Sequence, residues 1–338
     1  MKIIVTGGAG FIGSHTVIEL INNGYEPVII DDLRNAEPFI VDQIENITGK
    51  VIKHYAVNCG DVISMNQIFK KEKPRGVIHF AADKAVGESV ENPLKYFENN
   101  ISNLIQLLKV VDQFELKSFV FSSSCTVYGN PDTIPVVEST PTKPAFSPYG
   151  ETKQMGEKIL LDYFKNKTNC NLSLLRYFNP IGAHSSGKIG ELPLGVPNNL
   201  IPFIMQTAAG KREALTVFGN DYDTPDGYCI RDYIHVVDLA DAHVLTLKYG
   251  MKKNHNPLVL NVGTGKGHSV LDVIETFKRE VGAKLNFKIG NRRAGDVPSI
   301  YADNKKIVAL LGWKPRYSLA DALIHAWKWE QELKKHIG

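Results

Sequence analysis

The sequence is poor in cysteine, with four in 338 residues. Cys59, Cys125, Cys170 and Cys229 lie far apart, and none belongs to a C-x-x-C pair. Disulfide-stapled domains and cysteine-rich zinc sites need close, repeated spacings, so this pattern excludes both and is typical of a reducing compartment. We therefore expect a cytoplasmic protein.

Long hydrophobic runs and an excess of one charge are also missing. No stretch approaches the ~18 apolar residues of a membrane span, and the apolar run after Met1 is too short for a signal-peptide core. With 39 basic and 36 acidic residues, the net charge is +3, which favours neither nucleic acid nor a membrane as a partner. The length of 338 residues exceeds the ~250–300 at which one core usually stops growing, so we expect one large or two fused domains.

Short apolar runs alternate with amphipathic segments in the N-terminal half. The runs are Ile3–Thr6, Pro27–Ile30, Gly76–Ala81 and Ser118–Ser122, and helical patterns cover Phe11–Asn23 and Pro93–Phe114. Strands that alternate with helices are typical of parallel βαβ units with both sheet faces covered. The sequence therefore predicts an α/β fold: a Rossmann-type doubly wound parallel sheet with a smaller mixed α/β domain.

The first predicted turn is rich in glycine. Gly7, Gly10 and Gly13 lie where the first strand feeds the first helix. Glycine there permits a tight turn and lets a pyrophosphate reach the free N–H groups of the helix N-terminus. Asp31 ends the second run, where a carboxylate binds ribose hydroxyls and repels a 2′-phosphate. The pattern predicts a dinucleotide site that takes NAD, although the neighbouring Arg34 leaves a reading with NADP open.

A tyrosine and a lysine follow the strand that ends in serines. Tyr149 and Lys153 are four residues apart in a helical pattern, so they share one face. A free tyrosine, with a pKa of ~10, is a weak base, and a nearby ammonium and an oxidised nicotinamide both favour the phenolate. Ser124 would hydrogen-bond the substrate oxygen and relay the proton. This spacing alone is more often incidental, but after a dinucleotide turn it predicts Tyr149 as the base, assisted by Lys153 and Ser124.

Together these motifs resemble the extended short-chain dehydrogenase/reductase family. The resemblance is carried by Thr6–Gly13, Asp31, Phe80–Ala82, Asn99, Ser122–Ser124, Tyr149 and Lys153. Further motifs are similar to the branch of the family that epimerises UDP-linked hexoses: Lys84–Ser89, Ser122–Gly129, Leu175–Pro180, Pro197–Leu200, Phe218–Tyr222 and Arg231–Val236. The similarity extends from Met1 to Trp329.

The resemblance implies reversible epimerisation of UDP-galactose and UDP-glucose at sugar C4, with tightly bound NAD as cofactor. Tyr149 would take the proton from the 4-OH while C4 gives a hydride to NAD, and the 4-keto intermediate would turn before the hydride returns. The UDP part would be held firmly and the hexose loosely. A UDP-hexose substrate is implied, as is a homodimer formed through the helices Pro93–Phe114 and Tyr149–Phe164.

The resemblance also assigns residues to each ligand. Matches to cofactor contacts are Gly7, Gly10, Phe11, Ile12, Gly13, Asp31, Asp32, Asn35, Asn58, Cys59, Phe80, Ala81, Ala82, Lys84, Asn99, Ser122, Tyr149, Lys153, Tyr177 and Phe178. Matches to substrate contacts are Lys84, Ser124, Tyr149, Asn179, Asn199, Leu200, Thr216, Phe218, Arg231, Tyr233, Arg293, Asp296 and Ile300. Asn58 stands where many relatives carry an aspartate, and we expect its neighbour Cys59 to be a packing residue.

Within the substrate set, the resemblance implies four roles around the UDP part. Arg231 and Arg293 suit the pyrophosphate, since guanidinium groups match phosphate oxygens. Asp296 would take the uridine ribose hydroxyls, and Phe218 would lie against the uracil.

We expect the NAD-binding domain to span 1–178, with segments at about 231–262 returning to it. In particular, Arg231–Val237 and Val259–Val262 are expected to rejoin this domain. The UDP-sugar-binding domain would use 179–230 and 267–338. Gly182–Pro202, rich in proline and glycine, is predicted to be a loop that lines the sugar site.

A metal site and the alternative activities each require residues that can be looked for in the sequence. His79, His184, His235 and His243 share no metal-ligand spacing, so we expect no metal and structural roles for them. A nucleotide-sugar 4,6-dehydratase would carry Asp-Glu where this chain has Ser124-Cys125. A non-catalytic NAD-sensing regulator typically loses the tyrosine or the lysine, and a net oxidoreductase would consume external NAD.

Substrate breadth depends on one position. Ile300 matches a residue whose bulk decides whether N-acetylated hexoses fit, and isoleucine is smaller than tyrosine and larger than cysteine. UDP-glucose and UDP-galactose are therefore expected as the main pair. Weak turnover of UDP-N-acetylglucosamine and UDP-N-acetylgalactosamine is the alternative.

Overall fold

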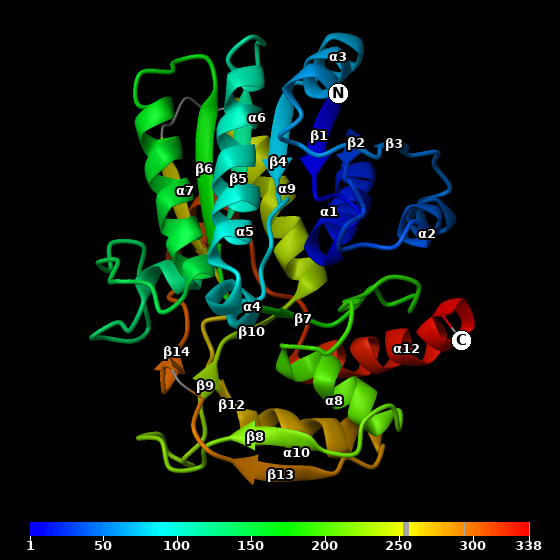
Figure 1. Ribbon diagram of the computed structural model, residues 1–338, viewed down its shortest axis with the longest axis vertical. Coiled ribbons are helices and arrows are strands. Elements are labelled where there is room, and N and C mark those ends of the chain that lie inside the picture. The colour runs from blue at the N-terminus through cyan, green and yellow to red at the C-terminus, as the bar shows by residue number, and fades with distance from the viewer. Residues whose placement is uncertain (253–256, 294, 338) are drawn as a thin grey trace.

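The computed structural model describes residues 1–252, 257–293 and 295–337. Its centre is a seven-stranded sheet in the order β11-β6-β5-β4-β1-β2-β3, with neighbouring strands parallel (Figure 1). The strands are β1 (Lys2–Thr6), β2 (Glu26–Ile30), β3 (Lys53–Tyr55), β4 (Gly76–His79), β5 (Ser118–Ser124), β6 (Asn171–Tyr177) and β11 (Leu258–Val262). The strand order reverses between β1 and β4. This arrangement confirms the predicted doubly wound sheet.

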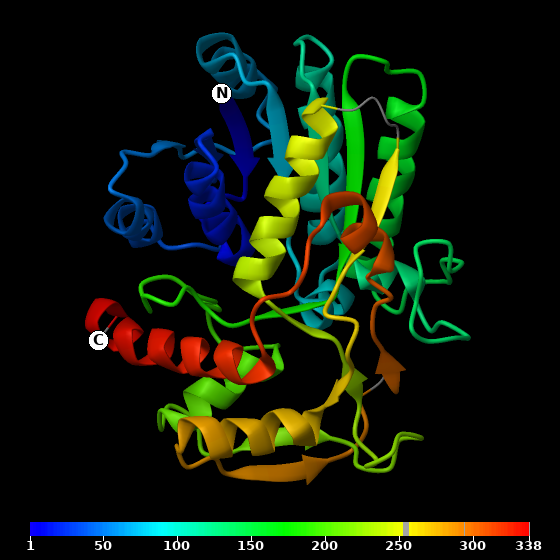
Figure 2. The same ribbon diagram turned by 180° about the vertical axis from the view of Figure 1, so that it is seen from behind.

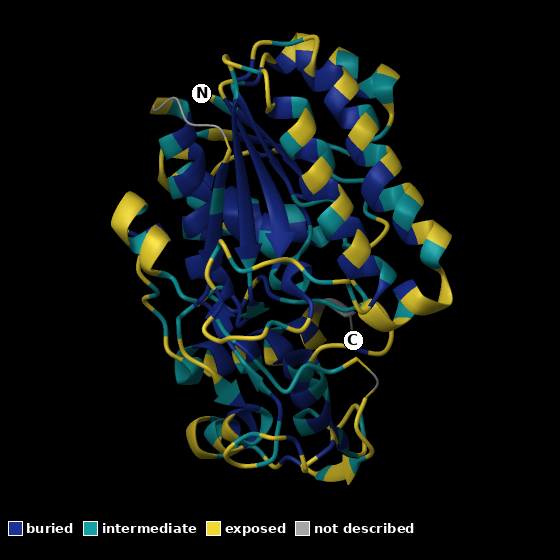
Figure 3. Cartoon of the chain, turned by 90° about the vertical axis from the view of Figure 1, so that its left-hand side faces the viewer, coloured by how far each residue is buried: buried dark blue, intermediate teal, exposed yellow. Residues whose placement is uncertain are grey.

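Helices cover both faces of this sheet (Figures 1 and 2). One face carries α1 (Phe11–Asn22), α2 (Phe39–Thr48) and α9 (Val236–Lys252), and the other carries α3 (Val62–Glu72), α6 (Asn103–Val111) and α7 (Pro148–Phe164). In β1, Ile3 and Val5 pack into the first hydrophobic cluster and Ile4 into the second, because successive side chains of a strand point to opposite faces. Strands buried on both faces need continuous apolar runs, and Figure 3 shows these strands buried between helices with exposed outer sides.

The helix predicted over Pro93–Phe114 is interrupted. A π-helical turn, Glu98–Ser102, separates α5 (Pro93–Phe97) from α6, and α6 ends at Val111. The buried Asn100 in this turn donates from its amide to Thr152 Oγ1 at 3.0 Å and to the Asp83 carbonyl at 3.0 Å. Such turns recur at functional positions, and this one brings Asn99 to the cavity described below.

The remaining elements form a smaller mixed α/β part beyond the carboxyl edge of the main sheet (Figures 1 and 2). Its strands pair as β7 (Asn179–Ile181) with β10 (Tyr233–His235), β8 (Leu215–Phe218) with β13 (Phe287–Gly290), and β9 (Ile230–Arg231) with both β12 (His268–Ser269) and β14 (Ser299–Ile300). Its helices α8 (Leu200–Ala208), α10 (Val270–Val281) and α12 (Leu319–Ile337) share a hydrophobic cluster. Two short helices, α4 (Val86–Glu91) and α11 (Lys305–Leu311), lie elsewhere in the chain. None of the helices in the described residues has both the length and the apolar composition needed to cross a membrane.

The two segments expected to return to the NAD-binding domain pair with different sheets. β11 pairs with β6 inside the sheet, and α9 covers one of its faces. The strands at Arg231–Val237, β9 and β10, instead pair with short strands outside the main sheet. Strand partners are chosen by the backbone edges that tertiary packing leaves open, which local sequence does not encode. The domain boundaries themselves stay a prediction.

A buried carboxylate between β9 and β10 joins three separate segments. Asp232 is fully buried, and its carboxylate accepts hydrogen bonds from Thr264 N at 2.8 Å, Thr264 Oγ1 at 2.7 Å, Gly265 N at 3.0 Å and Ala302 N at 3.2 Å. Each donor is satisfied by this one side chain, so the link between the loop after β11 and the strand region after β14 depends on it.

Asp232→Ala should therefore lower the free energy of unfolding by about 3 kcal/mol or more, because hydrogen bonds to a charged acceptor contribute about 1.5–3 kcal/mol and the donors stay buried. Chemical denaturation measures the change. The control is Asp132→Ala, which removes a carboxylate that is 84% exposed and paired with Lys143. It should change the unfolding free energy by less than about 0.5 kcal/mol. Equal losses in the two variants would contradict the assigned role of Asp232.

Candidate active site

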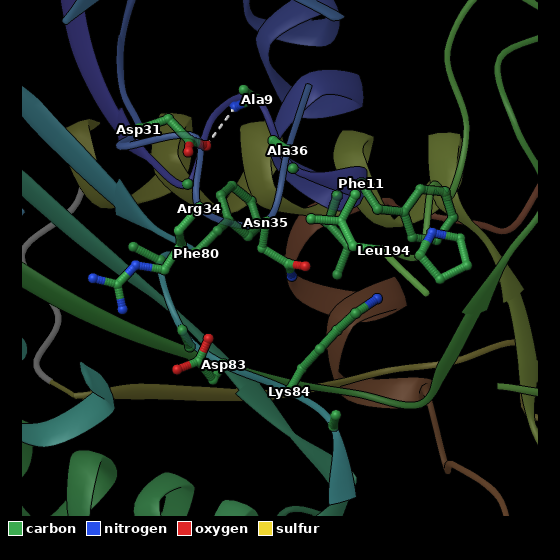
Figure 4. Close-up of a pocket in the computed structure, with 18 of the residues that line it drawn as sticks. Ala9, Phe11, Asp31, Arg34, Asn35, Ala36, Phe80, Asp83, Lys84 and Leu194 are labelled. Atoms are coloured by element: carbon green, nitrogen blue, oxygen red, sulfur yellow. Dashed lines mark hydrogen bonds between the residues drawn. The ribbon is translucent and has the colours of Figure 1, made fainter. Parts of the chain in front are cut away.

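A cavity of about 680 Å³ lies at the carboxyl edge of the main sheet, where the strand order reverses. Open α/β sheets bind ligands at this position. The ends of β1, β2 and β4 and the start of α1 form one wall, and residues 190–199 contribute to the other. Figure 4 shows Lys84 extending across the cavity from the segment after β4.

Nearly all predicted cofactor contacts line this one cavity. They are Gly7, Gly10, Phe11, Ile12, Gly13, Asp31, Asp32, Asn35, Asn58, Cys59, Phe80, Ala81, Ala82, Lys84, Asn99, Tyr149, Lys153 and Tyr177. Ser122 and Phe178 are not among the lining residues: the Ser122 carbonyl accepts from Lys153, and Phe178 packs in a hydrophobic cluster. Among the predicted substrate contacts, Lys84, Tyr149 and Asn199 line the same cavity.

The glycine turn between β1 and α1 leaves no room for side chains. Gly7 has φ +70°, and a Cβ there would lie 2.8 Å from Ala81 N. A Cβ on Gly13 would lie 2.1 Å from the Gly7 carbonyl oxygen. At the start of α1, Gly10 provides no side-chain cap, so the first N–H groups of the helix are available to an anion.

An acidic residue closes the same turn. Asp31 Oδ2 accepts from Ala9 N at 2.9 Å (Figure 4), and Oδ1 accepts from Leu33 N at 3.0 Å. Burial raises the pKa of Asp31, and these backbone hydrogen bonds oppose the rise. The carboxylate is thus held at the end of β2, beside the glycine turn.

Arg34, whose guanidinium left a reading with NADP open, is engaged within the protein. Its Nε donates to Asp32 Oδ2 at 3.0 Å, and its Nη1 donates to Asn99 Oδ1 at 2.9 Å. Asn58 Nδ2 donates to the same Asp32 oxygen at 3.0 Å. A carboxylate therefore already partners the Arg34 guanidinium, which favours NAD over a cofactor with a 2′-phosphate.

Three residues of α7 and β5 form the predicted catalytic group. Ser147 caps α7, with its hydroxyl accepting from Gly150 N at 3.2 Å, and Pro148 occupies the first turn, where its missing N–H costs little. Tyr149 is buried, with 7% of its surface exposed, and the Ser124 side chain at the end of β5 acts to lower the pKa of its hydroxyl. The structure thus brings the predicted base and its hydroxyl partner together at the cavity.

Burial affects the protonation of this group. Lys153, expected to favour the phenolate together with an oxidised nicotinamide, donates from Nζ to the Ser122 carbonyl at 2.9 Å and lies 5.8 Å from the Tyr149 ring centre. Burial raises the pKa of Tyr149 well above its ordinary value, although the Ser124 side chain acts against the rise, and burial lowers the pKa of Lys153 to about 8. Desolvation penalises both charged forms, so the tyrosine by itself is a phenol at neutral pH.

Sequence reasoning missed one residue in the opposite wall. Glu191 Oε1 accepts from Lys84 Nζ at 2.8 Å and from Asn199 Nδ2 at 2.8 Å, and its carbonyl accepts from Trp329 Nε1 at 2.9 Å. It therefore joins the segment after β4 to the loop that precedes α8. The predicted loop Gly182–Pro202 pointed to this region, but a single glutamate in it carried no signal of its own.

A second group of predicted substrate contacts meets in the smaller part. Arg293 Nη2 donates to Asp296 Oδ1 at 2.7 Å, and Arg231 Nη2 lies 3.6 Å from the same oxygen. The Arg293 guanidinium lies 5.8 Å from the Phe218 ring centre. Two arginines thus lie beside one carboxylate, and an aromatic ring lies near one of them. The two guanidinium groups are suited to binding a diphosphate.

The other predicted contacts lie on short elements around these two groups. Asn179 begins β7, Leu200 begins α8, Thr216 is within β8 and Tyr233 begins β10. Ile300, on β14, is 6% exposed and packs in the cluster that contains Tyr128 and Phe178.

Four histidines considered as metal ligands have partners within the protein. His79 Nδ1 lies 2.7 Å from Thr6 Oγ1, His243 Nδ1 lies 2.8 Å from the Leu239 carbonyl, His235 Nε2 lies 3.0 Å from His325 Nδ1, and His184 Nδ1 lies 2.8 Å from Ser186 Oγ. Across the described part of the chain, no group of three or more histidine, cysteine or acidic side chains is arranged to hold a metal ion.

Comparison with known proteins agrees with this geometry. The model of a family described as GDP-mannose 4,6 dehydratase matches residues 4–325. A UDP-glucose 4-epimerase of Dictyostelium discoideum is 48% identical over 97% of this chain and 95% of its own length. The crystal structure of a UDP-glucose 4-epimerase from Stenotrophomonas maltophila with bound NAD and formylated UDP-arabinopyranose has a TM-score of 0.97 at 44% identity, covering 99% of each chain. The Bifidobacterium longum UDP-glucose 4-epimerase in complex with NAD+ and UDP has a TM-score of 0.94 at 43% identity, covering 98% of each chain.

The chain belongs to this family and, within it, to the UDP-glucose 4-epimerases. This confirms the predicted membership of the branch that epimerises UDP-hexoses. Although the family is described by a dehydratase, the residues of this site do not support dehydration. Dehydration needs an acid–base pair at positions 124 and 125, where this chain has a serine and a thiol whose pKa burial raises to about 12.

Glu191→Ala should free the loop before α8, because it removes the acceptor shared by Lys84 and Asn199. Trypsin cleavage after the exposed Lys188 in that loop should become several-fold faster, since proteolysis follows local opening. Quantitative mass spectrometry of the digest gives the rate. Asp162→Ala, which removes an exposed partner of Lys158 on α7, is the control and should leave cleavage at Lys188 unchanged. Unaltered cleavage in Glu191→Ala would show that the loop is held by other contacts.

Proposed function

We propose that this chain is an NAD-dependent UDP-glucose 4-epimerase that interconverts UDP-galactose and UDP-glucose. The observation that carries the proposal is that the glycine turn, Asp31, Tyr149 and Lys153 line one cavity. A nucleotide at the turn is thereby placed against the predicted base. The relatives' activity and the ligands of their crystal structures support the same reading.

The cofactor part of the cavity fits a dinucleotide. The pyrophosphate would meet the N–H groups at the start of α1, in a turn that requires glycine at positions 7 and 13 because a Cβ there would collide with the backbone of Ala81 or Gly7. Asp31 would receive the adenosine ribose, and the engaged Arg34 offers little to a 2′-phosphate. When bound, NAD accepts a hydride from sugar C4 and returns it to the opposite face.

Tyr149 supplies the proton chemistry of both half-reactions. As a phenolate it would take the proton of the sugar 4-OH, and as a phenol it would return that proton when the alcohol re-forms. Its buried site opposes the phenolate, so a positive charge is required nearby. Lowering a tyrosine pKa by three units takes about 4 kcal/mol. The Lys153 ammonium contributes to this, and the Ser124 hydroxyl shares the proton with the substrate oxygen.

The UDP part of the substrate is proposed to bind the second group. Arg231 and Arg293 would exchange their contacts with Asp296 for the diphosphate, which frees the carboxylate for the uridine ribose. Phe218, 46% exposed, would lie against the uracil. Lys84, Asn179 and Asn199 would contact the sugar and diphosphate between the two groups. The hexose is then the loosely held part, which lets the 4-ketose turn.

Competing activities lack a specific observation in their favour. A 4,6-dehydratase needs acid–base groups that Ser124 and Cys125 do not provide. A non-catalytic regulator has no need to keep Tyr149 and Lys153 together at the cavity. A net oxidoreductase is distinguished by its consumption of added NAD.

The assembly and compartment are part of the same proposal. We propose a homodimer through α5, α6 and α7, supported by exposed apolar side chains there, among them Leu94, Ile105 and Met155. We also propose a cytosolic location, supported by four cysteines that are all free thiols.

The decisive experiment is to incubate the purified protein with UDP-galactose and no added cofactor. We expect UDP-glucose to form without net NADH. Tyr149→Phe should keep its bound nucleotide but lower kcat by about 10²–10⁴-fold, the range of general acid–base catalysis. Absorbance of the released nucleotide and chromatography of the sugars measure both. Net NADH formation, or near-normal turnover in Tyr149→Phe, would refute the assignment.

Ile300 sets the expected substrate range. Because this side chain is packed against Tyr128 and Phe178, an N-acetyl group has little space, and UDP-N-acetylgalactosamine should turn over far more slowly than UDP-galactose. Ile300→Ala should narrow that difference at least several-fold, because it removes three carbons at the sugar site. The ratio of kcat/KM for the two substrates is the measurement. Comparable rates on both substrates in the wild-type enzyme would contradict this prediction.

A further inference from the structure

A buried ion pair lies one helical turn beyond the predicted catalytic lysine. Arg176 Nη2 donates to Glu157 Oε2 at 2.6 Å and its Nε donates to Oε1 at 2.9 Å. The two side chains are 9% and 6% exposed. Neither residue lines the cavity, and the mechanism above uses neither. Buried ion pairs are costly to desolvate and apolar residues of the same size often stabilise a core as well, so stability alone is a weak reason for this pair.

The pair belongs to a regular contact between α7 and the end of β5. Tyr149, Lys153 and Glu157 follow one another at intervals of four residues, so they lie on one face of α7. Three consecutive serines of β5 meet them. The Ser124 side chain acts to lower the pKa of Tyr149, the Ser122 carbonyl accepts from Lys153 at 2.9 Å, and Ser123 Oγ donates to Glu157 Oε1 at 2.5 Å.

Arg176 holds the carboxylate of this row in one orientation. It lies on β6, directly opposite Ser123 in the strand register, so both donors approach the same Glu157 oxygen. Its guanidinium is 4.9 Å from the Tyr128 ring centre, and Nη1 donates to the Glu138 carbonyl at 3.3 Å. A bidentate arginine fixed on both sides leaves its carboxylate little freedom.

We propose that Glu157 and Arg176 are positioning residues that keep Lys153 protonated and directed at the catalytic tyrosine. This inference rests on the proposed function, since it concerns the charge that Tyr149 needs. Glu157 supplies a buried negative charge one helical turn from Lys153 on the same face of α7, and Arg176 both orients that charge and limits its strength. Ser123, which is bonded to Glu157, is adjacent to Ser122, whose carbonyl is bonded to Lys153. The serines of β5 therefore link the position of the ion pair to that of Lys153.

The surroundings of Lys153 show why such support matters. Burial lowers the pKa of Lys153 to about 8, and Glu157 acts in the opposite direction. Two charged or titratable groups interact with Lys153 itself, His79 from β4 and Glu157 from α7. Tyr177, Tyr96 and Cys125 act on Tyr149, and Arg176 pairs with Glu157. Burial and Lys153 itself lower the pKa of His79 to about 3, so this histidine is neutral. Among these groups the carboxylate is Glu157.

The test is the alkaline limb of the kcat profile, measured on the enzyme with its retained nucleotide. Activity that requires a protonated lysine is lost as pH rises through the lysine pKa. Glu157→Gln removes the anion and leaves the Arg176 cation, so this limb should move to lower pH by about one unit. Arg176→Met leaves the Glu157 anion without its partner, so the limb should move to higher pH. KM for UDP-galactose should change little in either variant.

Opposite shifts separate positioning from a purely structural role, which would lower stability or activity without moving the limb in two directions. Each single change leaves an unpaired buried charge, which could unfold the protein. The double variant Glu157→Leu/Arg176→Met avoids this and is expected to stay folded. With both charges replaced by apolar groups, its limb should lie between those of the single variants. Glu157→Asp, which keeps the carboxylate, should retain most of the wild-type pH profile.

The matched control is Glu72→Gln at the opposite end of the sheet. Glu72 is a buried carboxylate bonded to Lys2, Lys53 and Tyr55, and it lies far along the chain from Tyr149, Lys153 and Glu157. It should lower the melting temperature and leave the alkaline limb in place. Coincident limbs in wild type, Glu157→Gln and Arg176→Met would overturn the inference. A wild-type enzyme that does not convert UDP-galactose would instead overturn the proposed function.

Discussion

The contact between the end of β5 and one face of α7 is the constraint on which the site depends. A strand of the parallel sheet ends in Ser122–Ser124, and these residues contact side chains at four-residue intervals along the helix. The packing leaves Tyr149 and Lys153 almost without water, which raises the pKa of the tyrosine and lowers that of the lysine. The tyrosine is therefore a neutral phenol at neutral pH, whereas the lysine, with a pKa of about 8, still carries most of its charge. The charges of this pair are set by the buried contact as well as by the two side chains.

The topology of the sheet determines where that contact can act. The strand order reverses between β1 and β4, and β5 lies beside β4, so the glycine turn, the end of β4, Tyr149 and Lys153 open into the same cavity. The smaller part lies beyond this edge and brings Arg231, Arg293 and Asp296 together. Under the proposed function, the substrate would be held by these arginines at one end and would meet Tyr149 at the other. This separation suits a reaction in which one end of the substrate stays fixed while the other turns.

Much of the fold and most of the cofactor site followed from short patterns. The apolar runs, the glycine turn, Asp31 and the Tyr149–Lys153 spacing are decided within a few residues by backbone geometry. Nearly all the predicted cofactor residues accordingly line one cavity. The pairing of β10 with β7, the π-helical turn at Glu98–Ser102 and the contacts of Glu191 were not predictable in this way. Each depends on partners distant in the sequence, and no local pattern distinguishes Glu191 from an exposed glutamate.

The sequence by itself determined which groups are present and how they are spaced: a turn that admits a pyrophosphate, a carboxylate after the second strand, and a tyrosine and a lysine on one helix face. Only the tertiary structure decided how those groups are charged. The sequence predicted that Lys153 and an oxidised nicotinamide would favour the Tyr149 phenolate, and the folded chain adds that Lys153 is bonded to the Ser122 carbonyl and that burial is the largest influence on both pKa values. Spacing along a helix is set by covalent geometry, but desolvation is the sum of everything that packs around a side chain, and that sum exists only in the folded molecule.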